Sequence, residues 1–388
     1  MAKFGKRNQV SINILDYNIM LLGESGAGKT SLINAVCNTY TNNPEAALFL
    51  EIGQERGADA ISGINYINCP EWQMDYDELS NSAGFATVCE DIIENKLKEY
   101  PDLKVVVFDT LDQLITISEN RVLEMWNTEC RRAGHPEKCT NSINACYSGF
   151  GRGEKKAIEI MLDMISRLRN VGVATIIIGH CKQKQIEDTF TGQTYQILTS
   201  DQQQNYFNAI KKNTHFIGLL YVDRQLAAEK TGKKVFGTNK DETINRVVSE
   251  TRRIRFRDDG AVVDCKSRFA DIVPEIEFSA TAFIKALEDA IKMEIGKSGT
   301  SIDDAKKMQA EKEAAELKRI AEAESTARIQ KEIDEVTSKI VEFFTENKTD
   351  IEVIKPILAK MRELGYNNPN EINNVDDAKT ILAMTLTV

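Results

Sequence analysis

The feature that most constrains this chain is a glycine-rich segment that follows an apolar run and precedes a helix-like stretch. The segment consists of Gly23, Glu24, Ser25, Gly26, Ala27, Gly28, Lys29 and Thr30. In a strand-to-helix turn of this kind, glycines let backbone N–H groups surround a phosphate, and the following helix presents its positive end. The segment therefore predicts a phosphate-binding loop for a nucleoside triphosphate.

The residues that end this loop have separate expected roles. Lys29 reaches the β- and γ-phosphates, Thr30 supplies a hydroxyl to Mg²⁺, and Ser31 begins the helix beside them. A carboxylate is also needed on the metal side, and the apolar run 104–109 ends in Asp109. We therefore expect ATP and Mg²⁺ as cofactors, with Thr30 and Asp109 as the metal-binding side chains.

Signalling GTPases share this loop pattern and are the obvious rival class. The segment Asn239-Lys240-Asp241-Glu242 imitates their guanine-reading tetrapeptide, but it ends in Glu242 where that motif needs Asp. No buried strand is expected before it, and residues 109–112 lack the switch glycine. These differences exclude a GTPase.

Hydrolysis also needs a carboxylate that orients the attacking water. Thr110 follows Asp109 at the position where AAA+ enzymes carry that glutamate, so the acid is expected at the end of the second strand, as in RecA-type enzymes. Glu51 and Glu55 both lie there, and the sequence leaves the choice between them open.

Three further side chains are candidates for the catalytic site. At the end of the last central strand, His180 is expected to touch the γ-phosphate and to move the loop that follows. Lys266 and Arg268, two residues apart on an extended segment, point to the same side. They predict either a surface pair within the chain or a finger by which Arg268 neutralises transition-state charge in a neighbouring subunit.

Hydrophobic patterning predicts a parallel sheet flanked by helices, because short apolar segments alternate with longer amphipathic ones. Expected strands cover residues 17–22, 47–51, 64–68, 104–109 and 173–179, and expected helices cover 29–40, 83–99, 119–132 and 153–170. Strand-like pieces at 195–199, 215–222, 252–257 and 261–265 predict an antiparallel extension of the sheet. The polar segments 182–208 and 225–242 are expected to be long loops.

The domain organisation is expected to have three parts. Residues 1–295 form an α/β ATPase domain that a helix at 281–294 closes. Residues 296–347 form a linker and a long charged helix, and residues 348–388 form a small helical module with helices at 350–364 and 375–385.

Composition limits the partners and the compartment. The net charge of −10 means that any contact with a polyanion must use a local patch. No window approaches a membrane-spanning length of apolar residues, and residues 1–6 lack a signal-peptide pattern, so we expect a cytoplasmic protein without a membrane partner. The 8 cysteines are expected to be reduced thiols. Cys130, His135, Cys139 and Cys146 lack the close pairs of most zinc modules, so we predict no zinc site, although the sequence leaves metal binding by these residues open.

In this order, the elements resemble the phage RecA/RadA-like P-loop ATPases, which include the Sak-type single-strand-annealing recombinases. The resemblance covers roughly residues 10–292 and rests on the phosphate loop, the strands ending in Asp109 and His180, and the segments 147–153 and 266–269. Residues 266–269 are similar to the Lys-Asn-Arg-Phe-Gly motif of bacterial RadA, with Ala270 in place of its final glycine. No zinc finger of the RadA type precedes the core, and the acidic helical tail has no counterpart.

The resemblance implies a RecA-like core in which ATP lies between subunits of a ring or filament, with Lys266 among the nucleotide-binding residues. Single-stranded DNA would follow the loops after the strands that end in Asp109 and His180. The cations in or near these loops are Lys182, Lys184, Lys211 and Lys212. A separate ridge suited to phosphates consists of Arg252, Arg253, Arg255 and Arg257. The expected protein is a DNA-dependent ATPase of phage or prophage recombination, repair or replication, in the cytoplasm of the bacterial host.

A different class of function is also compatible with the sequence. In this alternative, the protein is an ATP-dependent assembly or regulatory switch that docks a protein partner through its helical C-terminal region. The sequence leaves open whether the assembly is a ring or a filament. It also leaves open whether the DNA reaction is annealing, strand exchange or translocation.

Overall fold

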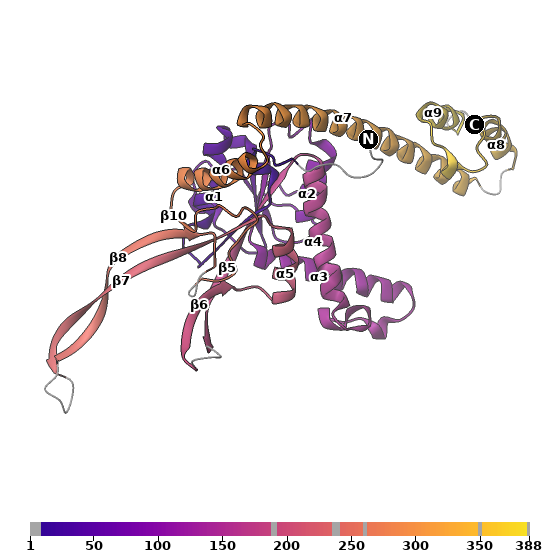
Figure 1. Ribbon diagram of the computed structural model, residues 1–388. Coiled ribbons are helices and arrows are strands. Elements are labelled where there is room, and N and C mark those ends of the chain that lie inside the picture. The colour runs from indigo at the N-terminus through magenta and orange to yellow at the C-terminus, as the bar shows by residue number, and fades with distance from the viewer. Residues whose placement is uncertain (1–8, 188–191, 235–240, 259–261, 348–350, 386–388) are drawn as a thin grey trace. The chain divides into compact units, whose positions relative to one another are not determined.

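The computed structural model describes residues 9–187, 192–234, 241–258, 262–347 and 351–385 (Figure 1). The chain divides into two compact units, Met1–Ala314 and Ala315–Val388, and the division falls inside the long helix α7 (Ile302–Glu346). The domain boundaries expected after residues 295 and 347 remain predictions. Asn239 and Lys240 of the GTPase-like tetrapeptide lie outside the described residues, as does residue 261 of the expected strand 261–265.

A mostly parallel sheet forms the centre of the first unit. Its strands lie in the order β3, β2, β4, β5, β1, β7, all parallel, followed by β8 antiparallel to β7 and β10 antiparallel to β8. The bounds are β1 (Ile19–Gly23), β2 (Ala47–Ile52), β3 (Tyr66–Cys69), β4 (Val105–Asp109), β5 (Ala174–Glu187), β7 (Phe216–Lys234), β8 (Asp241–Arg255) and β10 (Glu275–Glu277). The predicted α/β class, with an antiparallel extension of the sheet, is confirmed.

The register of the parallel strands brings four functional segments to one edge. β1 and β4 are buried along their whole length, as expected for apolar strands covered on both faces. In register, Gly23 lies opposite His180 of β5, and Glu51 of β2 lies opposite Asp109 of β4. Because parallel strands end at a common edge, the phosphate loop and the candidate acids are neighbours there.

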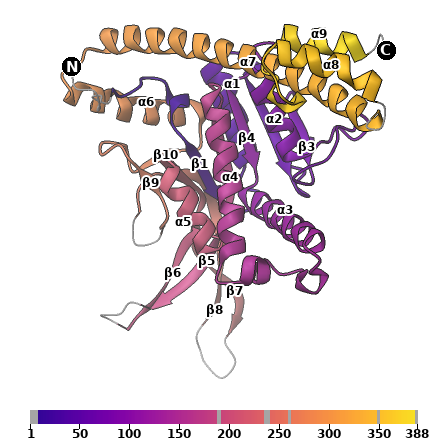
Figure 2. The same cartoon turned by 90° about the vertical axis from the view of Figure 1, so that its right-hand side faces the viewer.

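Helices cover both faces of the sheet (Figure 2). One hydrophobic cluster joins the sheet to α1 (Lys29–Thr41) and α6 (Ala280–Lys297). Another joins the opposite face to α2 (Phe85–Asn95), α3 (Leu111–Arg132), α4 (Arg152–Asn170) and α5 (Gln204–Asn213). Short 3₁₀ helices are η1 (Ile14–Asp16), η2 (Pro44–Ala46), η3 (Ala58–Ala60), η4 (Pro136–Lys138), η5 (Ile143–Ser148) and η6 (Pro369–Glu371).

The prediction of long loops at 182–208 and 225–242 is wrong for the described residues. β5 continues past the sheet and pairs with β6 (Thr194–Ser200), and β7 continues likewise and pairs with β8, so that two ribbons project from the first unit (Figure 1). Antiparallel pairing satisfies the backbone groups of these polar segments without burying their side chains. Within the expected strand 261–265, the described part has only a single bridge, between Leu198 and Val262, and β9 (Lys266–Ser267) follows it.

The second unit has a hydrophobic core of its own. The end of α7 packs with α8 (Ile351–Glu363) and α9 (Val375–Thr385), which confirms the helices expected at 350–364 and 375–385. The fully buried members of this core are Ile340, Ile357, Met361, Ala378 and Ile381. Throughout the described residues, no helix combines the length and the apolar character that crossing a membrane requires.

Candidate functional site

The phosphate loop has the backbone conformation that its glycines allow. Gly26 and Gly28 have φ of 74° and 98°, in the left-handed region that favours glycine. Gly28 is the N-cap residue of α1, and no side chain caps that end of the helix. The first N–H groups of α1 are therefore available to an anion.

Lys29 lies over the loop that it follows. Its side chain is only 6% exposed, and Nζ donates hydrogen bonds of 3.0 Å to the carbonyl oxygens of Gly23 and Glu24. Burial lowers the pKa of the Lys29 ammonium, and the negative charge of Asp109 opposes that shift. The ammonium is thus held beside the place where the loop would receive phosphates.

Thr30 and Asp109 meet at the centre of the site. Thr30 Oγ1 donates a hydrogen bond of 2.6 Å to Asp109 Oδ2, at the buried end of β4. Burial raises the pKa of the Asp109 carboxyl, whereas the hydrogen bond from Thr30 lowers it. These are the hydroxyl and the carboxylate that the sequence predicted for Mg²⁺.

Three side-chain oxygen atoms border the small space beside Gly57 that a side chain would fill, which we call the metal space. A Cβ atom built on Gly57 would lie 3.3 Å from Thr30 Oγ1, 3.8 Å from Asp109 Oδ2 and 3.8 Å from Glu51 Oε1. Oxygen ligands of this kind are those that Mg²⁺ prefers, usually together with waters and substrate phosphates. When bound, the ion would neutralise phosphate charge, and Thr30 with Asp109 would hold it.

Glu51 and Glu55 have different surroundings. Glu51 is 1% exposed; its Oε1 accepts a short hydrogen bond from the Ala58 N–H, and its Oε2 has no hydrogen-bond partner among the described residues. Burial raises the pKa of Glu51. Glu55 is partly exposed, and its Oε1 accepts a long hydrogen bond of 3.5 Å from Thr110 Oγ1. An unpartnered buried carboxylate oxygen beside the metal space is suited to binding a water or a cation's hydration shell.

His180 lies at the same edge and is held by the start of α3. Its Nδ1 lies 2.9 Å from Asp112 Oδ2, and Gln202 donates to the other oxygen of that carboxylate. The hydrogen bond that the Asp112 carboxylate accepts from His180 raises the pKa of His180. Burial alone would raise the pKa of Asp112, but the hydrogen bonds from His180 and Gln202 lower it below its ordinary value. Farther along β5, Gln183 Nε2 donates to Glu24 Oε1 at 3.3 Å, which ties this strand to the phosphate loop.

Lys266 and Arg268 do not join this cluster. β9 pairs with the beginning of β7, where Phe216 lies opposite Ser267, whereas the phosphate loop follows the other end of β1. Lys266 Nζ donates to Lys211 O, and Arg268 Nη2 donates to Lys212 O. Both cations therefore bind the carbonyl end of α5, where positive charge is favourable.

Many of the cations expected to follow DNA are paired within the chain. Lys182 binds Asp201 at 2.8 Å, and Lys211 binds Asp264 at 3.0 Å. Glu275 binds both Arg253 and Arg255, at 2.9 and 2.7 Å, and Arg257 Nε donates to Ile272 O at 3.3 Å. Lys184 and Lys212 have exposed side chains. The arginines therefore do not form a continuous unpaired ridge.

Arg252 lies elsewhere, against the phosphate loop. A Cβ atom built on Gly28 would lie 3.1 Å from Arg252 Nη1. Sequence reasoning assigned Arg252 to the DNA ridge and missed this contact. The available signal was the alternation of Arg252 with the apolar Ile254, which places both on one face of a strand.

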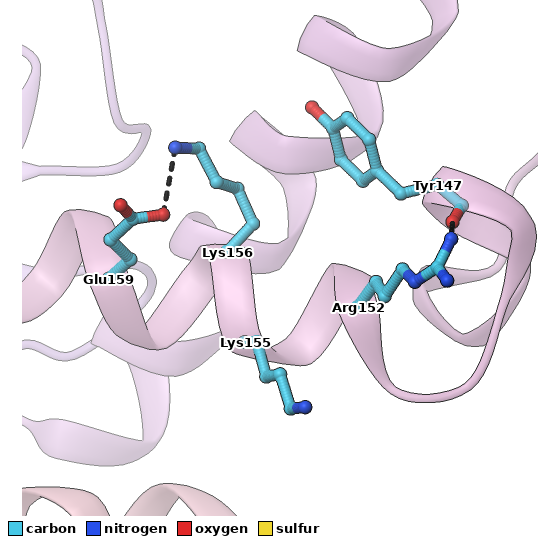
Figure 3. Close-up of a pocket in the computed structure, with 5 residues that line it drawn as sticks. All are labelled: Tyr147, Arg152, Lys155, Lys156 and Glu159. Atoms are coloured by element: carbon cyan, nitrogen blue, oxygen red, sulfur yellow. Dashed lines mark hydrogen bonds and ion pairs between the residues drawn. The ribbon is translucent and has the colours of Figure 1, made fainter.

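A second feature that sequence reasoning used only for its family resemblance is a pocket at the start of α4 (Figure 3). Its volume is about 280 Å³, and its lining residues are Tyr147, Arg152, Lys155, Lys156 and Glu159. In Figure 3, the Tyr147 ring and the Lys156 side chain lie on one side of α4, and Lys155 points away from them. Glycine spacing and the cations at 152, 155 and 156 were the signals in the sequence.

The cysteines are free thiols, as predicted. Within the described ranges, no group of three or more His, Cys, Asp or Glu side chains is placed to hold a metal ion by itself. Of the four residues whose metal binding was left open, His135 Nδ1 lies 3.1 Å from Glu137 Oε1, Cys139 Sγ lies 3.6 Å from Asn127 O, and Cys146 Sγ lies 3.7 Å from Ser142 O.

Comparison with known proteins identifies the family of the first unit. Residues 15–246 match the AAA domain family. Among solved structures, the chain is similar to the KaiC-like protein PH0186 from the hyperthermophilic archaeon Pyrococcus horikoshii OT3, with a TM-score of 0.28 and 11% identity over 62% of this chain and 77% of that chain. No curated protein sequence matches the chain. Because the family match covers more than half of the chain and includes the phosphate loop, Glu51, Asp109 and His180, the chain belongs to the AAA domain family of P-loop ATPases.

Proposed function

We propose that the protein is an Mg²⁺-dependent ATPase that binds single-stranded DNA and is stimulated by it, acting in phage or prophage recombination, repair or replication. The observation that carries the DNA part of this proposal is the pocket at the start of α4, where the Tyr147 ring lies with three cations. Proteins that bind single strands without sequence preference combine a positive surface with aromatic side chains on which bases stack.

The cations of this pocket are arranged around an accessible surface. Arg152 Nη1 donates to Tyr147 O at 3.1 Å, and Lys156 binds Glu159 at 2.8 Å. Lys155 is exposed and, in the part of the chain that the structure describes, has no ion-pair partner. The N-terminal turn of α4 adds its own partial positive charge. Together these groups favour a phosphodiester backbone.

A second aromatic side chain lies in the turn that precedes α4. Phe150 is 91% exposed, in a turn whose residues 147–151 all have positive φ, from 52° to 78°. The Tyr147 ring lies 4.9 Å from the Trp126 ring of α3. The exposed Phe150 ring has a face on which a base of a single strand can stack.

α3 offers a connection between the pocket and the nucleotide site. Asp112, in its first turn, binds His180, and Trp126, farther along, contacts Tyr147. In this proposal, Glu51 orients the attacking water and accepts its proton. His180 contacts the γ-phosphate, and its ion pair with Asp112 transmits that contact to α3. A shift of α3 would then alter the pocket, so that ATP and DNA bias the same element.

The active assembly is proposed to be a ring or filament with ATP at the boundary between subunits. Arg268 and Lys266 lie at the opposite edge of the sheet from their own phosphate loop, so only another subunit's nucleotide is within their reach. To act there, both side chains would exchange the carbonyl end of α5 for phosphate oxygens. Arg268 would then neutralise transition-state charge.

ATP turnover measured with and without single-stranded DNA, across a salt series, tests the proposal. Phe150→Ala is expected to weaken DNA binding by about 1–3 kcal/mol, the usual contribution of one stacked base. Lys155→Ala is expected to lower the slope of log affinity against log salt by about 0.7. Lys285→Ala, which removes an exposed lysine of α6 paired with Asp289, is the matched control. Turnover that DNA does not change would end the DNA part of the proposal.

The second unit supports one other candidate function, an ATP-dependent switch that docks a protein partner. Its separate core makes it a self-contained helical module. Deletion of residues 315–388 tests this, because Gln309 and Lys312 on the retained part of α7 still bind Ser11 and Asp16. A recombinase should keep DNA-stimulated turnover after the deletion, whereas a docking switch should lose its partner and keep basal turnover.

A further inference from the structure

The glycine that precedes Lys29 contacts two side chains from the distant end of the first unit. A Cβ atom built on Gly28 would lie 3.1 Å from Arg252 Nη1 and 3.1 Å from Phe278 Cζ. Gly28 is the N-cap of α1, so the contact occurs where the phosphate loop meets its helix. The guanidinium therefore lies at the surface of the loop and belongs to the same chain.

Strand alternation explains why Arg252 reaches this place. Arg252 and Ile254 lie on the same face of β8, and Ile254 is fully buried in the cluster that includes α1. Arg253 and Arg255 lie on the other face, where Glu275 binds both of them. The charge of Arg252 is thus separated from the carboxylate that binds its neighbours.

Phe278 positions the guanidinium. Its backbone N–H donates to Arg252 O at 3.2 Å, and its ring centroid lies 5.4 Å from Arg252 Cζ, in a cation–π contact. Among the described residues, no carboxylate pairs with Arg252. A preorganised arginine without a counter-ion, next to an anion-binding loop, is suited to bind phosphate with two parallel hydrogen bonds.

We propose that Arg252 is a nucleotide-binding residue that contacts the α- and β-phosphates in cis. The order of the sheet indicates which phosphates it reaches. His180, Asp109 and Glu51 lie on β5, β4 and β2, on one side of β1, whereas β7 and β8 lie on its other side. Since the metal and γ-phosphate groups occupy the first side, Arg252 faces the diphosphate end of the nucleotide.

This assignment has a kinetic consequence. The α- and β-phosphates are common to ATP and ADP, so the contact stabilises ground state and transition state equally and affects KM and not kcat. The inference rests on the ATPase part of the proposed function and is independent of its DNA part. If Arg252 binds the nucleotide, it is no longer one of the cations that could bind DNA.

Equilibrium titration with ADP and with a non-hydrolysable ATP analogue, in Mg²⁺ and without DNA, tests the inference. Arg252→Ala is expected to weaken both ligands by the same factor, about ten- to hundredfold, as for loss of a hydrogen bond to a charged group. Arg252→Lys keeps the charge without the fork and should lose less. Phe278→Leu removes the ring that contacts the guanidinium and should lower the affinity for both ligands by the same factor. This variant provides the test if Arg252→Ala does not fold.

Arg253→Ala is the matched control, since Arg253 lies on the opposite face of the same strand, and its affinity for both ligands should equal that of the wild type. Unchanged ADP affinity in Arg252→Ala would overturn the inference. Tighter binding would also overturn it, because Arg252 would then block the phosphate site. A loss of affinity for the ATP analogue alone would overturn it as well, because Arg252 would then contact the γ-phosphate. Missing DNA stimulation in the wild type would contradict only the DNA proposal.

Discussion

Thr30 Oγ1 and Asp109 Oδ2 are joined by a 2.6 Å hydrogen bond at the carboxyl edge of the sheet. Thr30 lies in the first turn of α1 and Asp109 ends β4, and β5 lies between β1 and β4 in the sheet. The hydroxyl and the carboxylate that would share a metal ion are therefore already in contact. The space that such an ion needs is bordered by Glu51 and by the missing side chain of Gly57.

Replacement of Glu51 by Gln should lower the turnover of the protein and raise its stability. We expect kcat to fall about 10²- to 10⁴-fold, the usual contribution of a general base. Burial raises the pKa of Glu51, so the folded protein binds more protons there than the unfolded chain. The stability of the protein therefore falls as pH rises from the ordinary pKa of a glutamate through the raised pKa of Glu51. Glu51→Gln removes that cost, and without nucleotide its melting temperature at neutral pH should be higher than that of the wild type.

Glu55→Gln is the matched control for this prediction, because Glu55 is partly exposed and reaches Thr110. Its turnover should stay close to that of the wild type. If Glu55→Gln lost turnover and Glu51→Gln kept it, the two assignments would have to be exchanged.

Gly57→Ala should fill the metal space without unfolding the chain. Gly57 has φ of −67° and ψ of −33°, which alanine adopts readily, but the new methyl would lie 3.3 Å from Thr30 Oγ1. Displacement of the ion by about 1 Å would cost on the order of a hundredfold in turnover. A Mg²⁺ titration of ATP turnover measures this effect. Gly296→Ala, at a helical position with nothing within 4 Å, should leave turnover unchanged. A normal Mg²⁺ response in Gly57→Ala would show that the metal lies elsewhere.

The pair formed by His180 and Asp112 should give the protein a pH-dependent stability. Because the pKa of His180 is raised above its ordinary 6.5, the stabilisation is fully present below that value and is lost as pH rises through the raised pKa. The lowered pKa of Asp112 sets the acid limit of this window. Melting curves of wild type and His180→Gln should therefore differ most at slightly acid pH and converge at alkaline pH. A difference that stays constant across this range would contradict the ion pair.

Arg268→Ala should retain ATP binding and lose turnover, by about a thousandfold or more if Arg268 acts as a finger. A mixing experiment shows in which subunit it acts. Chains carrying Lys29→Ala lack a working loop, and chains carrying Arg268→Ala lack the finger, so a mixture should recover activity only if Arg268 serves a neighbour. Melting curves control for its contact with Lys212 O at the end of α5. If the protein stays monomeric with ATP and Arg268→Ala is fully active, Arg268 has only this structural role.

Local patterns predicted the strand-loop-helix at residues 19–41, the buried strand ending in Asp109 and the helices of the second unit. Their information lies within a few turns of chain: glycine positions, apolar runs and helical periodicity. The two projecting ribbons escaped prediction because their polar residues resemble loop sequence. Their strands form through pairing of β5 with β6 and of β7 with β8, which local composition does not reveal.

The sequence by itself determined that this chain binds a nucleoside triphosphate, since the phosphate loop is a short contiguous segment whose backbone does the binding. Only the tertiary structure showed that Glu51 is buried opposite Asp109 in the sheet, whereas Glu55 is partly exposed. It also decided that Glu275 binds Arg253 and Arg255 while Arg252 lies at Gly28. The physical reason is that burial and ion pairing depend on strand register and on the faces of the sheet, which join residues far apart in the chain.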